Sequence, residues 1–120
     1  MTNDQCCTIV PYFLIHEGKE EIFKGLCEEF VEKTSGEPKC LYYGFSFLGN
    51  RAHCREGYED AQGVLHHLEN VDALLKQALE VAELEKLEIH GPETELEKLR
   101  GPLSALNPDF FVLEYGFRKG

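Results

Sequence analysis

Three side chains that can hold or exchange protons are spaced so that a strand and the next helix could bring them together. Glu56 and Tyr58 lie two residues apart in an alternating run, which places them on one face of a predicted strand. His67 follows just over two turns into a helical segment that we expect to pack over that face. A carboxylate, a phenol and an imidazole around one cavity could bind and deprotonate a phenolic or enolic substrate, with His67 as the base. In the alternative, all three residues are structural. Glu56 is a hydrogen-bond acceptor, Tyr58 packs in the core, and His67 is a buried histidine whose hydrogen bonds are all made.

The histidines and cysteines do not fall at metal-binding spacings. His66 and His67 are helix neighbours that point about 100° apart, and His53 and Cys54 are strand neighbours on opposite faces. The five cysteines contain no CxxC. Cys6-Cys7 could bind a soft metal or act in redox chemistry, but small residues at the start of an edge strand explain the pair more simply. The sequence therefore predicts no metal site and no cofactor.

Composition restricts the class of protein. A chain of 120 residues with 42% hydrophobic and 28% charged residues fits one soluble domain, and we expect a single domain over 1–120. Its net charge of -10 disfavours nucleic-acid backbones and anionic membrane surfaces as partners. No apolar run approaches a membrane span, and the first residues lack the features of a signal peptide, so we expect a cytoplasmic location.

The elements that would position these side chains centre on a hairpin. Two alternating runs joined by Gly49-Asn50 predict strands over Cys40–Leu48 and Arg51–Tyr58. A strand over Cys7–Ile15 precedes them, with Pro11 at an edge, at a bulge or facing an unpaired side. Before the hairpin the sequence predicts a helix over 19–33, and after it two helices capped by Asp60 and Asn70. A strand over 84–90, a helical segment over 92–106 and a strand over 110–117 follow. Gly101-Pro102 must kink or split the helical segment.

This order, β-α-β-β-α-α-β-α-β, predicts an α+β fold. It is the ferredoxin-like βαββαβ plan on an antiparallel sheet, with an extra C-terminal helix and strand. The hairpin face that should meet the helices carries Leu41, Tyr43, Phe45, Phe47, Ala52, Cys54, Glu56 and Tyr58. The opposite face mixes polar and apolar residues: Tyr42, Ser46, Leu48, Arg51, His53 and Arg55. Because that face is too apolar for water and too polar for a core, we predict that a second copy covers it in a homodimer.

Several short motifs resemble the antibiotic biosynthesis monooxygenase family. They are Val-Pro-Tyr-Phe at 10–13, Gly18-Lys19, Pro-Lys-Cys-Leu-Tyr-Tyr-Gly-Phe at 38–45, Arg-Glu-Gly-Tyr at 55–58 and His67-Leu68. The resemblance covers most of the chain and implies a dimeric α/β barrel with a pocket between sheet and helices. Some members oxidise phenols or quinols with dioxygen and no cofactor, and others degrade haem. This chain has no Trp, and Pro11 stands where the haem-degrading branch would have Asn.

Two hypotheses follow for function. The first is a cofactor-independent monooxygenase for a small aromatic or quinol-like substrate, with His67, Tyr58 and Glu56 as catalytic residues. In this hypothesis the substrate-binding residues are Tyr43, Phe45, Cys54 and Tyr12. The second is a non-catalytic dimeric domain that binds a small ligand or only assembles. A pocket with room for an aromatic ring would favour the first hypothesis, and a pocket filled by the protein's own aromatic side chains would favour the second.

Overall fold

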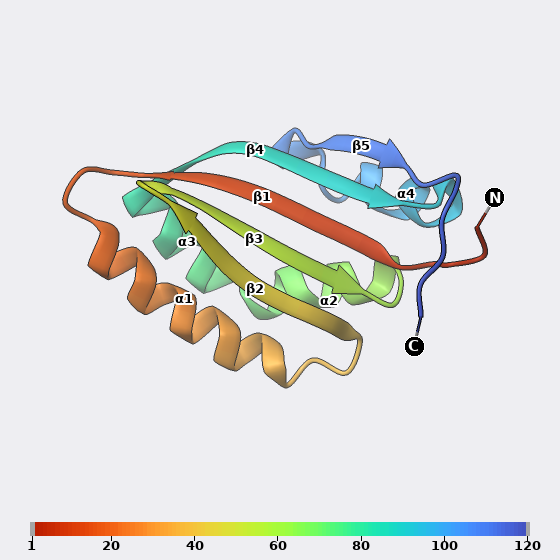
Figure 1. Ribbon diagram of the computed structural model, residues 1–120, viewed down its shortest axis with the longest axis horizontal. Coiled ribbons are helices and arrows are strands. Elements are labelled where there is room, and N and C mark those ends of the chain that lie inside the picture. The colour runs from red at the N-terminus through yellow and green to blue at the C-terminus, as the bar shows by residue number, and fades with distance from the viewer. Residues whose placement is uncertain (1, 120) are drawn as a thin grey trace.

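The fold is built on one five-stranded sheet, seen in the computed structural model of the chain, which describes residues 2–119 (Figure 1). Its strands lie in the order β2-β3-β1-β4-β5. The elements are β1 (Cys7–Ile15), α1 (Glu20–Ser35), β2 (Cys40–Leu48), β3 (Arg51–Tyr58), α2 (Ala61–Asn70), α3 (Asp72–Val81), β4 (Ala82–Gly91), α4 (Glu93–Arg100), the 3-10 helix η1 (Ser104–Leu106) and β5 (Asp109–Val112). The α+β class and the ferredoxin-like order with an extra helix and strand are thus confirmed.

The sheet is mixed. Strands β1 to β4 pair antiparallel, as predicted, but β5 runs parallel to β4. The reason is the connection, because a parallel neighbour needs a crossover and α4 with η1 supplies one. Gly101-Pro102 separates these two helices, as predicted. Strand β5 ends at Val112, so the predicted strand over 110–117 is too long.

The strand boundaries in the first half of the chain agree with the alternation in the sequence. Gly49 has φ of 59° in the β2–β3 turn, a backbone conformation that glycine adopts without strain. The edge-strand interpretation of Cys6-Cys7 is wrong, because β1 lies at the centre of the sheet and Cys7 pairs with Tyr58. Among the described residues, Pro11 pairs with Leu87 on β4 but with no residue of β3, so the alternative of an unpaired side holds and the edge alternative does not. The register shift lies one residue further on, between Tyr12 and Phe13.

The α-helices α1 to α4 lie on one face of the sheet (Figure 1). No described helix covers the other face, which we call the bare face; only the C-terminal segment reaches one end of it, where Leu113 and Arg118 lie near Val10 and Tyr42. The apolar stripe of α1, including Cys27, packs on that covered face. Two clusters of buried side chains form the core: one around Phe13, Phe23 and Leu74, the other around Ile89 and Leu96. None of the described helices is long and apolar enough to cross a membrane.

The helix that carries His67 begins at a strong cap. Asp60 accepts a hydrogen bond from the Gly63 N–H at 3.0 Å, which confirms the predicted cap of α2. Glu95 accepts a second one from the Ala61 N–H, also at 3.0 Å. Asn70 does not cap α3, whose N-cap is Val71 without a side-chain bond. The Asn70 amide turns instead toward the end of α1.

Candidate functional site

Four ionisable or polar side chains form one buried array between the sheet and the helices. Glu37 lies just after α1, Glu56 and Tyr58 lie on β3, and His67 lies on α2. The His67 Nδ1 is 2.9 Å from Glu37 Oε2, and its Nε2 is 3.3 Å from Glu56 Oε1. The side chains of Glu37, Glu56 and His67 are no more than 5% exposed. One imidazole is thus held between two carboxyl groups out of contact with bulk water.

Hydrogen bonds from neighbouring residues fix both carboxyl groups. The Tyr58 hydroxyl donates to Glu56 Oε1 at 2.7 Å. The Asn70 amide donates to Glu37 Oε2 at 2.8 Å and to the Lys33 carbonyl at 3.2 Å. These contacts join the end of α1, the end of α2 and the middle of the sheet, so the array is preorganised before any ligand binds.

The environment of Glu56 favours its neutral form. Burial raises the pKa of the Glu56 carboxyl, and the nearby His67 and the hydrogen bond from Tyr58 offset part of that effect. Burial also raises the pKa of the Tyr58 hydroxyl and of the Cys54 thiol, with Glu56 as a second cause in both. Tyr58 and Cys54 are therefore neutral, and Glu56, like them, holds its proton more tightly than usual.

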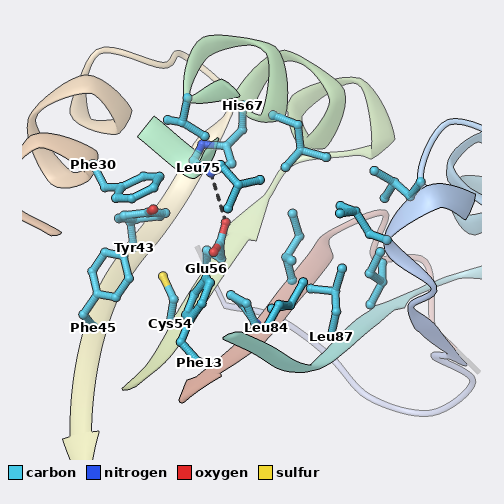
Figure 2. A pocket seen from close by; sticks show the side chains of 17 residues that line it. Phe13, Phe30, Tyr43, Phe45, Cys54, Glu56, His67, Leu75, Leu84 and Leu87 are labelled. Carbon is cyan, nitrogen blue, oxygen red and sulfur yellow. Dashed lines mark ion pairs between the residues drawn. The ribbon is translucent and has the colours of Figure 1, made fainter. Parts of the chain in front are cut away.

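An apolar cavity lies beside the array (Figure 2). It occupies the junction of the two core clusters, since Phe13 and Phe30 of the first and Leu87 and Ile89 of the second both line it. In Figure 2, Phe30, Tyr43 and Phe45 lie to one side of Glu56 and His67, and Leu84 and Leu87 lie to the other. The space that a water molecule can enter is about 50 Å³. An apolar cavity with a few converging polar groups is a typical ligand site.

The structure places five of the seven residues named from the sequence at this cavity: His67, Glu56, Tyr43, Phe45 and Cys54. Tyr58 is fully buried behind Glu56 and does not line the space. Tyr12 lies on the opposite face of the sheet, where its ring packs on His53 at 4.9 Å between centroids. The placement of Tyr12 at the pocket is therefore wrong.

Sequence reasoning missed Glu37 and Asn70. Glu37 lies in the turn between α1 and β2, outside any periodic pattern, and nothing local marks it as buried. Only Gly36 and Pro38 on either side indicate a constrained turn that could direct its side chain inward. Asn70 was interpreted as a helix cap, which is the ordinary role of an asparagine beside a helix start.

The described residues, 2–119, contain no group of three His, Cys, Asp or Glu side chains arranged to hold a metal ion. Glu37 and Glu56 lie on opposite nitrogens of the His67 ring, so they do not converge on one point. The chemistry that this arrangement can perform with its own atoms is proton transfer.

The chain is similar to MupZ from Pseudomonas fluorescens. The two are 52% identical with a TM-score of 0.93, over 97% of this chain and 91% of that one. No protein-family model matches the sequence, and no curated protein matches it.

More distant structures share the fold. A candidate antibiotic biosynthesis monooxygenase from Nitrosomonas europaea is 17% identical with a TM-score of 0.66, over 74% of this chain and 91% of that one. A conserved protein from Methanosarcina mazei is 18% identical with a TM-score of 0.67, over 72% of this chain and 91% of that one. At these identities the likeness concerns the backbone fold.

Proposed function

Because the chain belongs to the family of MupZ and has the fold of the antibiotic biosynthesis monooxygenases, we propose that it is an enzyme that exchanges protons between Glu56 and a substrate in the apolar cavity. The observation that carries this proposal is the buried array of Glu37, His67 and Glu56 at the cavity wall. Burying ionisable groups costs several kcal/mol for each ion after relaxation. The cavity, with about 50 Å³ of space and aromatic rings at one end, meets the criterion for the non-catalytic alternative. The buried array is the observation on the other side: a domain that only assembles would gain nothing from that cost of burial, so the array favours catalysis.

Roles within the array follow from its contacts. Both ring nitrogens of His67 already face carboxyl groups, so His67 serves as the relay and not as the group that touches substrate. Glu56 and His67 both line the cavity, and Glu56 is the one we assign as the acid or base toward the substrate, because the ring nitrogens of His67 are occupied. Glu37 is a positioning residue, because it acts through His67.

Following the chemistry of the antibiotic biosynthesis monooxygenases, whose fold the chain shares, the proposed reaction is a cofactor-independent monooxygenation. A CH2 group activated by a neighbouring enol or phenol loses a proton to Glu56 in its ionised form. The resulting carbanion adds dioxygen to give a hydroperoxide, which loses water and leaves a new carbonyl group. The CH2 group thereby gains one oxygen atom, and the second oxygen leaves with two hydrogens as water. A quinol-like compound can enter this scheme through its keto tautomer, in which a ring CH becomes the CH2 group.

One observation favours a second candidate, a redox-neutral proton transfer such as an isomerisation or an addition to a double bond. The raised pKa of Glu56 favours a carboxylic acid that donates a proton, whereas oxygenation must begin with proton removal. The array can supply both steps of an isomerisation, because Glu56 can donate a proton that His67 then helps to restore.

Oxygen uptake separates these candidates. A naphthoquinol is incubated with the wild-type protein and with Glu56→Gln, and dissolved dioxygen is followed with an electrode. Monooxygenation predicts uptake that the wild type accelerates and the variant does not. Equal uptake in both samples would contradict the oxygenase. Solvent deuterium incorporation into an enolisable ketone under nitrogen, abolished in Glu56→Gln, would support proton transfer by Glu56. Together with oxygen uptake that is equal in both samples, it would favour the redox-neutral candidate.

We further propose that two copies associate through the bare face of the sheet. Support comes from the mixture of side chains there: Thr8, Val10, Tyr12, Tyr42, Ser46, His53, Arg55, Lys86 and Glu88. Several of these already pair across strands, including Tyr12 with His53 and Arg55 with Tyr42. Such a face has the mixed apolar and polar composition of a subunit interface.

A further inference from the structure

The cavity has two chemically different ends. On one side of Glu56 and His67 lie the aromatic rings of Phe30, Tyr43 and Phe45, and on the other side lie Leu84 and Leu87 (Figure 2). The protein's own side chains fill the aromatic end. The ring centroid of Phe45 lies 5.6 Å from that of Tyr43 and 5.9 Å from that of Phe30. Phe23 packs edge-on behind Phe45 at 6.4 Å. Rings at these separations form a packed wall, so that end is closed to a ligand.

The aliphatic end reaches the surface. Four leucines that line it are only half-buried, whereas the side chains deeper in the cavity, such as Leu87 and Ile89, are buried. The four come from different elements: Leu68 of α2, Leu75 of α3, Leu84 of β4 and Leu106 of η1. Leu75 packs against the first core cluster, Leu68 and Leu106 pack against the second, and Leu84 packs against both. We take this ring of leucines as the entrance, with Glu56 at its inner end.

The cavity is also small. Its space of about 50 Å³ is well below the ~150 Å³ of an apolar cavity that holds benzene. A fused ring would have to displace the packed aromatic wall or part the two core clusters. A hydrocarbon chain needs only rotamer changes of leucine side chains, which interconvert between staggered wells.

From the closed aromatic wall, the leucine entrance and the small volume, we propose that the substrate is a slender aliphatic molecule that carries a neutral oxygen function. The oxygen meets Glu56, and the hydrocarbon chain runs outward past Leu87 to the four leucines. This inference rests on the proposed function for the role of Glu56 and names the substrate class of that same site. A neutral head group is expected because the array already contains two carboxyl groups and the chain carries a net charge of -10.

Binding of methyl ketones with six to twelve carbons, measured by calorimetry, tests the substrate class without requiring turnover. Each methylene that enters the cavity should raise affinity about fourfold, until the chain extends beyond the entrance. Naphthol serves as the bulky aromatic comparison and should bind more weakly than the longer ketones. No ketone binding, an affinity that does not depend on chain length, or naphthol binding more tightly than every ketone would overturn the proposal.

Two variants of one helix locate the binding site. Leu75→Phe adds bulk inside the entrance, whereas Leu79→Phe adds the same bulk one turn later on α3, outside the cavity lining. The chain-length dependence should be lost in Leu75→Phe and kept in Leu79→Phe. If both variants changed the chain-length dependence equally, Leu75 would not line the entrance for the substrate. If Leu75→Phe does not fold, the wild-type chain-length series still decides the substrate class.

The same ketones separate this inference from the proposed function. Exchange of their α-protons in deuterated water, followed by NMR, reports proton transfer by Glu56. Chain-dependent binding without exchange would leave the substrate class standing and contradict the proposed catalysis. Exchange at the same rate for every chain length, with no gain in affinity, would support proton transfer and refute the aliphatic substrate.

Discussion

Glu56 gives the fold a titratable group whose effect on stability has a definite sign. The pKa of its carboxyl is raised in the folded state by burial, above the value of about 4.3 expected in the unfolded chain. Between those two values the folded state binds more protons than the unfolded state, so the free energy of unfolding falls as pH rises. Each pH unit by which the folded-state pKa exceeds the unfolded-state value lowers the free energy of unfolding by about 1.4 kcal/mol once pH is above both values.

We therefore expect Glu56→Gln, which cannot titrate, to gain stability relative to the wild type as pH is raised above about 4.3. The difference should level off once pH exceeds the folded-state pKa. Urea unfolding of both proteins across a pH series measures it. A difference that is constant, or that shrinks as pH rises, would show that burial does not control the proton on Glu56.

Glu37 is predicted to matter for catalysis without touching a ligand. Its two oxygens lie 2.9 and 3.1 Å from His67 Nδ1, which assigns the hydrogen to that nitrogen. Glu37→Gln should lower the rate of ketone proton exchange by about 10²–10⁴, the usual range for a general acid–base contribution, with little change in ketone affinity. The ¹⁵N shifts of the His67 ring should move as well, which a loss of packing alone would not cause. Unchanged ¹⁵N shifts and an unchanged exchange rate would exclude this role.

At the scale of elements, the start of α2 determines how firmly His67 is held. Asp60 accepts the Gly63 N–H and also forms an ion pair with Lys39 at 2.7 Å. The ion pair and the helix-start hydrogen bond together keep the pKa of Asp60 below its usual value. Asp60→Ala should cost about 0.5–2 kcal/mol of stability, the range for loss of an N-cap.

The matched control for this prediction is Asp72→Ala at the start of α3. Asp72 makes only an exposed ion pair with Lys76 and has no cap hydrogen bond. Exposed pairs contribute ~0–1 kcal/mol, so its loss should have a small effect. Thermal and urea unfolding of the two variants give the comparison. A cost for Asp72→Ala as large as that for Asp60→Ala would contradict the importance of the cap.

Local patterns in the sequence predicted the elements but only part of the site. Alternation in the hairpin and the Gly49-Asn50 turn gave the register that puts Glu56 on the helix side, because side chains in a strand have a strict period of two. The same rule, applied to Tyr12, would have placed it beside His53 and away from the cavity. Glu37 could not be predicted, because its position depends on a turn and on contacts with residues about thirty positions later. The parallel β5 likewise depends on the path of a crossover and not on its own sequence.

At the scale of the whole molecule, the site exists because the core is divided. The two clusters of buried side chains meet over the irregular stretch of β1 around Pro11 and Phe13, and the cavity lies at that junction. A single continuous core would fill this space with side chains, since protein interiors pack densely. The helices also cover only one face of the sheet, so the cavity and the bare face lie on opposite sides of the same strands (Figure 1).

That separation allows the interface to be changed without disturbing the cavity, and it leads to the prediction of a dimer. Val10 lies on the central strand and points away from the helices, beside Thr8 and Tyr42 on the bare face. In a dimer formed through this face, burying about 2,000 Å² or more in total, Val10→Lys would place two charges at the centre of the interface. Ile22→Lys is the control, because Ile22 is 52% exposed on α1, away from the bare face.

Sedimentation should show a dimer for the wild type and for Ile22→Lys, and a monomer for Val10→Lys that still binds ketones. A wild-type monomer at micromolar concentration would refute the dimer and leave the proposed chemistry to a single chain.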